Sequence, residues 1–156
     1  MNGYYDTGLL LKLYTAEPES PAVQAFVHHR AQAIQITDLH HAECVSAFRL
    51  KQFRGECTAT EATGALKLLE EDIRAGVLRM VAVEWSQVWK KCRSLAEAHA
   101  ALTGCRTLDA LHVASALMLG AREFITSDHR QTAFASKVGL SVTDPTRGCI
   151  SSPPLK

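Results

Sequence analysis

Short apolar runs alternate along the chain with longer runs in which apolar residues recur every three or four positions. Runs of the first kind are typical of buried strands, and runs of the second kind are typical of amphipathic helices. The alternation predicts an α/β domain with a largely parallel sheet, in which helix outweighs strand. The expected strands are Gly3–Tyr5, Ala33–Ile36, Val77–Val83, Phe124–Thr126 and Leu140–Val142. The expected helices are Gly8–Tyr14, Pro21–His29, Leu39–Phe53, Thr60–Ala75, Trp85–Leu102, Leu108–Leu119 and Arg130–Val138.

Capping residues and glycines mark the ends of these helices. Ser20 precedes Pro21, a pair that predicts a capping hydroxyl followed by a first-turn proline. Thr58 precedes Glu61 by three residues, which predicts a second capped start. Glycines are expected just past the helix ends, at Gly55, Gly76, Gly104, Gly120 and Gly139.

The length of 156 residues predicts one domain over residues 1–145, followed by a tail over 146–156 where the apolar periodicity is lost. The 17 basic and 16 acidic residues give a net charge of +1, which provides no general attraction for nucleic acid. Five cysteines form an odd set without a C-x-x-C pair, which indicates a reducing cytoplasm. Neither a signal peptide nor a membrane span is recognised, so a soluble intracellular protein is expected.

Two aspartates directly follow predicted strands. Asp6 ends the first strand and Asp128 comes shortly after the fourth, so both are expected at the carboxyl edge of the sheet, where open α/β sheets bind ligands. Thr7 and Thr126 are expected to support these carboxylates through their hydroxyls. Each aspartate, taken alone, is equally explained as a helix N-cap.

Glu43 lies within a predicted helix, on an arc that the sequence assigns to the buried face. A buried carboxylate costs several kcal/mol unless it is paired, protonated or bound to a metal. Arg54 lies too far along the helix to be its partner. The arc of apolar and small residues around it is Leu39, Ala42, Ser46, Ala47, Leu50 and Phe53.

Asp109 occupies the first turn of another predicted helix, where Thr107 is a candidate cap and the helix dipole favours a negative charge. Residues three, four and seven positions later are His112, Val113 and Ala116, which place Asp109 on a mostly apolar face. His112 is in position to hydrogen-bond Asp109 or a phosphate, and Arg106 is the preferred candidate for a phosphate contact among the basic residues.

Together the four acids are expected to crowd one notch. Two carboxylates about 4 Å apart repel by about 4 kcal/mol at an effective dielectric constant near 20, so such a cluster needs cations. Carboxylates without His or Cys companions favour Mg²⁺ or Mn²⁺. If these four acids bind cations, the other twelve acids leave a basic excess of five residues, which suits a polyanionic substrate. The chemistry such a site favours is metal-assisted hydrolysis of phosphodiester bonds.

The four acids lie in motifs with a fixed order along the chain. These motifs are Tyr5-Asp6-Thr7-Gly8-Leu9-Leu10-Leu11-Lys12-Leu13-Tyr14 with Glu17-Pro18, Thr37-Asp38-Leu39 ahead of Glu43, Arg106-Thr107-Leu108-Asp109-Ala110-Leu111-His112-Val113-Ala114, and Ile125-Thr126-Ser127-Asp128. In these motifs the sequence resembles the PIN-domain ribonucleases, most closely the toxin of VapBC-type toxin–antitoxin pairs. The likeness runs from Tyr4 to Pro145, and Gly8 departs from the serine that many relatives carry there.

The resemblance implies a three-layer α/β/α domain with a mostly parallel sheet of four or five strands. It implies that Asp6, Glu43, Asp109 and Asp128 bind Mg²⁺ or Mn²⁺ and catalyse RNA cleavage. Hydrolysis by metal-activated water would leave 5′-phosphate and 3′-OH ends. A cytoplasmic homodimer is expected, neutralised by a small antitoxin whose tail enters the active-site groove.

Three other interpretations remain open at this stage. A transition-metal site at His40-His41 with Glu43 and Cys44 has a spacing that fits no usual zinc pattern. A phosphoacceptor aspartate at Asp6 would expect a nearby lysine and, in one class, a second aspartate at position 8, where this chain has glycine. The third interpretation is a binding module, in which the acids hold an ion or an arginine of the antitoxin and no reaction is catalysed.

Overall fold

The computed structural model describes residues 3–147. Its elements lie close to the ranges that the apolar pattern predicts, except that the third strand is much shorter than expected. The strands are β1 (Gly3–Tyr5), β2 (Ile34–Ile36), β3 (Leu78–Met80), β4 (Glu123–Ile125) and β5 (Ser141–Thr143). The helices are α1 (Thr7–Leu11), α2 (Ser20–Arg30), α3 (Asp38–Phe53), α4 (Ala59–Ala75), α5 (Trp85–Thr103), α6 (Thr107–Met118) and α7 (His129–Lys137).

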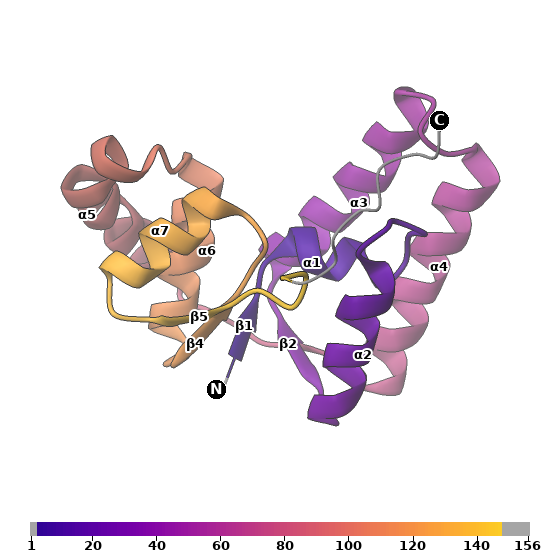
Figure 1. Ribbon diagram of the computed structural model, residues 1–156, viewed down its shortest axis with the longest axis horizontal. Coiled ribbons are helices and arrows are strands. Elements are labelled where there is room, and N and C mark those ends of the chain that lie inside the picture. The colour runs from indigo at the N-terminus through magenta and orange to yellow at the C-terminus, as the bar shows by residue number, and fades with distance from the viewer. Residues whose placement is uncertain (1–2, 148–156) are drawn as a thin grey trace.

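All strand pairs in the described residues are parallel. β4 lies between β1 and β5, and β2 pairs separately with β3. β1 and β2 are in contact and lie side by side (Figure 1), but no ladder of backbone hydrogen bonds joins them within residues 3–147. The expected α/β class with parallel strands is therefore confirmed, as a three-stranded and a two-stranded sheet rather than one sheet of four or five strands.

Helices cover both sides of the strands. α5, α6 and α7 lie on one side, and α1, α2, α3 and α4 lie on the other (Figure 1). Because side chains alternate along a strand, Tyr4 and Phe124 enter the hydrophobic core beneath α5–α7, while Tyr5 and Ile125 enter the core beneath α1–α4. Three-residue strands thus separate two hydrophobic cores.

The predicted helix ends are mostly found. The Thr58 hydroxyl accepts a hydrogen bond from the Glu61 backbone, and the Glu61 carboxylate accepts one from the Thr58 backbone. The five predicted glycines all have positive φ values, the conformation that favours glycine past a helix end. The prediction for Ser20 is wrong, because α2 already begins at Ser20 with Glu19 as its N-cap. The Ser20 hydroxyl instead donates to the Thr15 carbonyl and accepts from the Glu17 amide.

The predicted buried face of α3 is also wrong. His40, Cys44 and Phe48 are its buried side chains, whereas Leu50 is 42% exposed and Phe53 is 87% exposed. α3 and α4 run beyond the strands as a pair (Figure 1), so the last turns of α3 have no sheet beneath them. Asp38 is the first helical residue of α3 and follows the N-cap Thr37.

Within residues 3–147, no helix is both long enough and apolar enough to cross a membrane. The cysteines in this range, Cys44, Cys57, Cys92 and Cys105, are free thiols. Cys149 and most of the expected tail lie outside the described residues.

Candidate active site

Asp6 and Asp128 stand at the same edge of the sheet. Each follows the carboxyl end of a strand, and the two strands, β1 and β4, are parallel neighbours. The Thr126 hydroxyl links the two aspartates, because it donates to Asp6 Oδ2 (2.6 Å) and accepts from the Asp128 backbone N–H (3.0 Å). Thr126, rather than Thr7, is therefore the hydroxyl that supports the Asp6 carboxylate.

Asp6 is both a helix cap and a buried acid. Its Oδ1 accepts from the Leu9 backbone N–H at 2.8 Å as the N-cap of α1, and its side chain is only 4% exposed. Burial raises the pKa of Asp6 to about 6, and the negative charge of Asp128 adds to this effect. The donors Thr126 and Leu9, together with His112, act in the opposite direction but do not cancel it.

Asp128 caps α7 in the same way. Its Oδ1 accepts from the backbone N–H groups of Arg130 (2.7 Å) and Gln131 (3.0 Å), and the Arg130 guanidinium lies 3.4 Å from Oδ2. Partial burial raises the pKa of Asp128, but these hydrogen bonds and the positive charge of Arg130 outweigh it, so the pKa lies below its ordinary value. Asp128 is therefore ionised over the whole physiological range.

Glu43 reaches the same region from α3, where it is paired with His112 of α6. Its Oε2 accepts from His112 Nε2 (2.5 Å) and from the Thr7 hydroxyl (2.5 Å). Partial burial raises the pKa of Glu43, but the hydrogen bonds from His112 and Thr7 and the charge on His112 outweigh it, so the pKa is lowered overall. The partner of this inward carboxylate is thus a histidine 69 residues later in the chain.

His112 is 2% exposed and is fixed on both sides of its ring. Because an ionised carboxylate only accepts hydrogen bonds, His112 Nε2 carries a proton when it contacts Glu43. On the other side of the ring, Nδ1 is hydrogen-bonded to the Tyr4 hydroxyl at 2.9 Å. The hydrogen bond to Asp109 that its spacing suggested is not formed, because the ring turns toward Glu43.

Asp109 lies in the first turn of α6, as expected, but its helix is capped by Arg106 rather than Thr107. Its Oδ2 accepts from the Arg106 backbone N–H (3.1 Å), and its Oδ1 accepts from Gln131 Nε2 (3.1 Å). The Arg106 side chain is exposed and is not among the residues that line the cavity described next. The preferred basic candidate of the sequence analysis therefore lies outside this cavity.

One cavity of about 570 Å³ brings the four acids together. They arrive from four separate parts of the chain: the ends of β1 and β4, and the helices α3 and α6. Thr7, His112 and Gln131 line it beside them, and Lys12, Glu17 and Lys51 line it as well. The sequence alone gave no role in the site to Lys12, Glu17 or Gln131.

The four carboxylates share the cavity without forming a direct ligand cage. Within residues 3–147, no group of three or more His, Cys, Asp or Glu side chains is placed to hold a metal ion. Each acid has its own donors instead: Thr126 and Leu9 for Asp6, His112 and Thr7 for Glu43, backbone amides for the other two. These hydrogen bonds stabilise the ionised carboxylates in part, so mutual repulsion is not the only influence on them, and the bound cation stays a prediction.

Gln131 provides an observation that points to a ligand. Its side chain is 6% exposed, and its Nε2 is held by Asp109. Its Oε1 is buried and has no hydrogen-bond partner in the described residues, a state that native proteins rarely leave unfilled. Carboxylate and amide oxygens suit Mg²⁺ or Mn²⁺, and Mg²⁺ usually keeps several of its waters. The residues present therefore fit a hydrated hard cation held partly through water.

The adjacent histidines do not form a transition-metal site. His40 is fully buried, and its Nδ1 accepts from the Thr37 backbone N–H, so that Nε2 donates to the Tyr5 carbonyl. Burial lowers the pKa of His40 to about 3, which keeps the ring neutral. His41 points elsewhere and contacts Glu70 of α4.

Compared with models of known protein families, the sequence matches none, and it matches none of the curated proteins. A functional proposal for this chain therefore rests on the side chains that line the cavity and on the motifs that carry them.

Proposed function

We propose that this chain is a metal-dependent endoribonuclease of the PIN-domain type, and the toxin of a VapBC-type toxin–antitoxin pair. The observation that carries the proposal is that four acids distant in sequence line a single cavity. They are the four acids of the motifs that resemble this family, Asp6, Glu43, Asp109 and Asp128. The contact between β1 and β2 supports the finer expectation of one continuous sheet, in which β2 and β3 extend β1, β4 and β5.

Asp6, Glu43, Asp109 and Asp128, with the unpaired oxygen of Gln131, are the groups that would hold Mg²⁺ or Mn²⁺. When bound, such a cation lowers the pKa of a water and stabilises charge on the phosphate that the water attacks. Attack by water leaves a 5′-phosphate and a 3′-OH, and no covalent intermediate on the protein is needed.

The protein's own part in this chemistry is to hold charged oxygens in fixed directions. Thr126 orients Asp6, while His112 and Thr7 orient Glu43, so these two carboxylates have little freedom to turn. Side chains fixed in advance lose little entropy when the substrate arrives. His112 acts through Glu43 in this scheme, which replaces the phosphate contact first expected of it.

The phosphoacceptor alternative is disfavoured by the surroundings of Asp6. Asp6 is 4% exposed and each of its oxygens already accepts one hydrogen bond. A remaining lone pair can contact a small cation, whereas a phosphoryl group bonded to this buried oxygen would need far more room. The lysine nearest in sequence, Lys12, is paired with Glu17 and Glu19.

A binding module without turnover is the second candidate. The observation that favours it is that every one of the four acids already has a hydrogen-bond donor within the protein. In this case the cavity would hold a cation or an arginine of the antitoxin, and bound RNA would dissociate without being cleaved.

Incubation with total RNA distinguishes these candidates. With Mg²⁺ or Mn²⁺ we expect cleavage that stops when a chelator is added, and no cleavage by Asp6→Asn. The matched control is Asp38→Asn, which removes an exposed aspartate outside the cavity and should cleave normally. Mapped ends should carry 5′-phosphate and 3′-OH. Cyclic phosphate ends would overturn the mechanism, and metal-dependent binding without products would favour the binding module.

The proposal also includes a cytoplasmic homodimer and a small antitoxin partner. Apolar side chains exposed on the α3–α4 pair, Leu50, Phe53 and Leu68, are available for such contacts. Light scattering of the purified chain would report the dimer. Co-expression with an adjacent small reading frame should suppress both growth arrest and RNA cleavage.

A further inference from the structure

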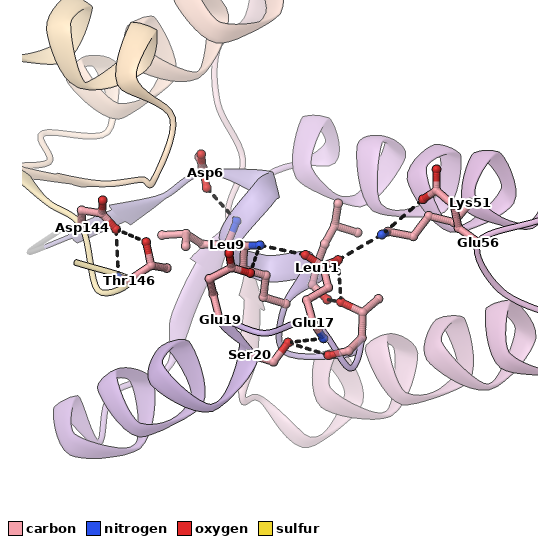
Figure 2. Close-up of polar contacts among 12 residues, drawn as sticks. Asp6, Leu9, Leu11, Glu17, Glu19, Ser20, Lys51, Glu56, Asp144 and Thr146 are labelled. Carbon is pink, nitrogen blue, oxygen red and sulfur yellow. Dashed lines mark hydrogen bonds and ion pairs between the residues drawn. The ribbon is translucent and has the colours of Figure 1, made fainter. Parts of the chain in front are cut away.

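A second charged cluster lines the same cavity at some distance from the four acids. Glu17 lies between two lysines: Lys12 Nζ is 2.7 Å from Glu17 Oε2, and Lys51 Nζ is 3.0 Å from Glu17 Oε1. Figure 2 shows Lys51 between Glu17 and Glu56. Among the described residues that line the cavity, Lys12 and Lys51 are the lysine or arginine side chains.

The cluster is held in place by its own loop. The Ser20 hydroxyl donates to the Thr15 carbonyl (2.6 Å) and accepts from the Glu17 backbone N–H (3.1 Å), and the Thr15 hydroxyl donates to Glu17 Oε1 (3.0 Å). These contacts, drawn in part in Figure 2, fix the Glu17 carboxylate between the lysines. Both lysine side chains are mostly buried, with exposed fractions of 15% and 25%.

The charges of this cluster are stable. Partial burial raises the pKa of Glu17, but hydrogen bonds from Lys12, Lys51 and Thr15 outweigh it and lower the pKa to about 2. Burial lowers the pKa of Lys12, and its contacts with Glu17 and Glu19 more than compensate, so that the pKa is raised. Both lysines are therefore positive at any pH at which the protein works.

Each lysine is separated from one of the four acids by several residues of the same helix. Lys51 lies eight residues after Glu43 on α3, which is about 12 Å along the helix axis. Lys12 lies at the end of α1, whose other end is capped by Asp6. A phosphate that contacts the lysines is therefore a different phosphate from the one held near the acids.

We propose that Lys12 and Lys51, spaced by Glu17, form a binding subsite for a backbone phosphate of single-stranded RNA that flanks the cleaved bond. This inference rests on the proposed function and extends it to the substrate contacts. The outer acids Glu19 and Glu56 hold the lysines only at 3.3 and 3.6 Å and are 39% and 45% exposed. Such rim ion pairs are weak, so a phosphate displaces them, while Glu17 stays and keeps the two ammonium groups apart.

The test measures the affinity for a short single-stranded RNA as a function of salt, with Ca²⁺ in place of Mg²⁺ and a gel to check that the RNA stays intact. Each phosphate contact on a single strand contributes about 0.7 to the slope of log K against log salt. Because the two lysines share one phosphate, we expect Lys12→Gln and Lys51→Gln each to reduce the slope by up to about 0.7 and to weaken binding by up to about fivefold near 0.1 M salt, and the double variant to lose no more than about 0.7 in slope. Lys12→Arg and Lys51→Arg should restore the slope.

Lys67→Gln is the matched control, because Lys67 on α4 is 75% exposed, pairs with Glu71 and does not line the cavity. It should leave the slope unchanged. Glu56→Gln provides the opposite test, since it releases Lys51 and should tighten RNA binding by about twofold to fivefold. An equal loss in Lys67→Gln, or unchanged slopes in both cavity variants, would overturn the subsite.

The outcome is separable from that of the proposed function. If the wild-type protein cleaves RNA and the lysine variants bind it with unchanged salt dependence, the subsite is refuted while the nuclease stands. If the wild-type protein neither binds nor cleaves RNA, the nuclease is refuted and the subsite with it. A lysine variant that loses RNA binding must unfold at the same urea concentration as the wild type, which shows that its fold is intact. If it unfolds at a lower concentration, the salt slope of the arginine variant at the same position decides whether the phosphate contact was lost.

Discussion

Replacing Asp6 by asparagine should make the folded protein more stable at neutral pH when no metal is present. Burial holds the pKa of Asp6 at about 6 instead of its ordinary 3.8. Between these values the folded protein binds the proton more tightly than the unfolded chain does, so its free energy of unfolding falls as the pH rises. Because a tenfold change in an acid constant is worth about 1.36 kcal/mol, the whole loss is about 3 kcal/mol.

Asparagine carries no charge and escapes this loss. Its side-chain oxygen can still accept from the Leu9 backbone N–H, so α1 keeps its cap. We therefore expect Asp6→Asn to match the wild-type stability near pH 4 and to exceed it by about 2–3 kcal/mol near pH 8. For a domain of this size such a gain raises the melting temperature by about 2–4 °C per kcal/mol.

Urea unfolding followed by the fluorescence of Trp85 and Trp89, in a chelator and across this pH range, measures the difference. Buried His40 makes the wild-type protein lose stability as the pH falls from its ordinary pKa toward about 3, but this effect is common to both proteins and cancels. Asp38→Asn is the control, and it should be slightly destabilising because an exposed first-turn charge is lost.

Two outcomes would refute the reasoning. A difference between wild type and Asp6→Asn that does not change with pH would mean that Asp6 is not a strained buried acid. A wild-type protein more stable than the variant near pH 8 in chelator would mean that the carboxylate is stabilising by itself. Added Mg²⁺ should reduce the difference in free energy of unfolding between the wild type and Asp6→Asn, because a cation that binds only the folded wild type stabilises it by mass action.

Three further predictions concern stability. Thr126→Val removes the hydroxyl that donates to the Asp6 carboxylate and accepts from the Asp128 backbone N–H. The free energy of unfolding, measured in urea, should fall by about 1–3 kcal/mol. Arg30→Gln breaks the paired contacts of 2.6 and 2.8 Å with Glu123 and should cost about 1 kcal/mol near pH 7. Because Arg30 lowers the pKa of Glu123, this difference should disappear as the pH falls below that lowered value and the carboxylate is protonated. Gly64→Ala within α4 should gain about 0.5–1 kcal/mol in thermal unfolding, whereas Gly76→Ala, at φ 76°, should lose about 1–2 kcal/mol; equal signs for the two would contradict the backbone argument.

The order of strands and helices was predictable because each element has its own apolar period. The strand Gly3–Tyr5 is found as predicted, and the helix over residues 85–103 differs by one residue at its end. The length of each paired strand was predictable only in part. The run from Val77 to Val83 is apolar enough for seven residues of strand, but pairing with the short β2 sets a ladder of only three.

The meeting of the four acids in one cavity was predicted from their places at strand ends and on inward helix faces, whereas their hydrogen-bond partners were not visible in the sequence. His112 and Glu43 are 69 residues apart, and no spacing rule relates side chains on different helices. The apolar period of α3 misled for a physical reason, since Leu50 and Phe53 follow the helical repeat yet have no layer to pack against. Lys12 and Glu17 had no predicted role, because their place in the cavity depends on the loop that the Ser20 hydroxyl closes.

The pairing of β1 with β4 has a consequence for synthesis on the ribosome. In the described residues β1 forms its ladder with β4 alone, about 120 positions later in the chain, and the donor to Asp6 lies just beyond that strand. At a synthesis rate of about 5–20 residues per second, Asp6 waits roughly 6–24 s for Thr126 to be made. An unfinished chain therefore cannot assemble the cavity. A protein proposed to cut RNA would stay harmless to the messenger and ribosome producing it until Thr126 and the strand before it have been made.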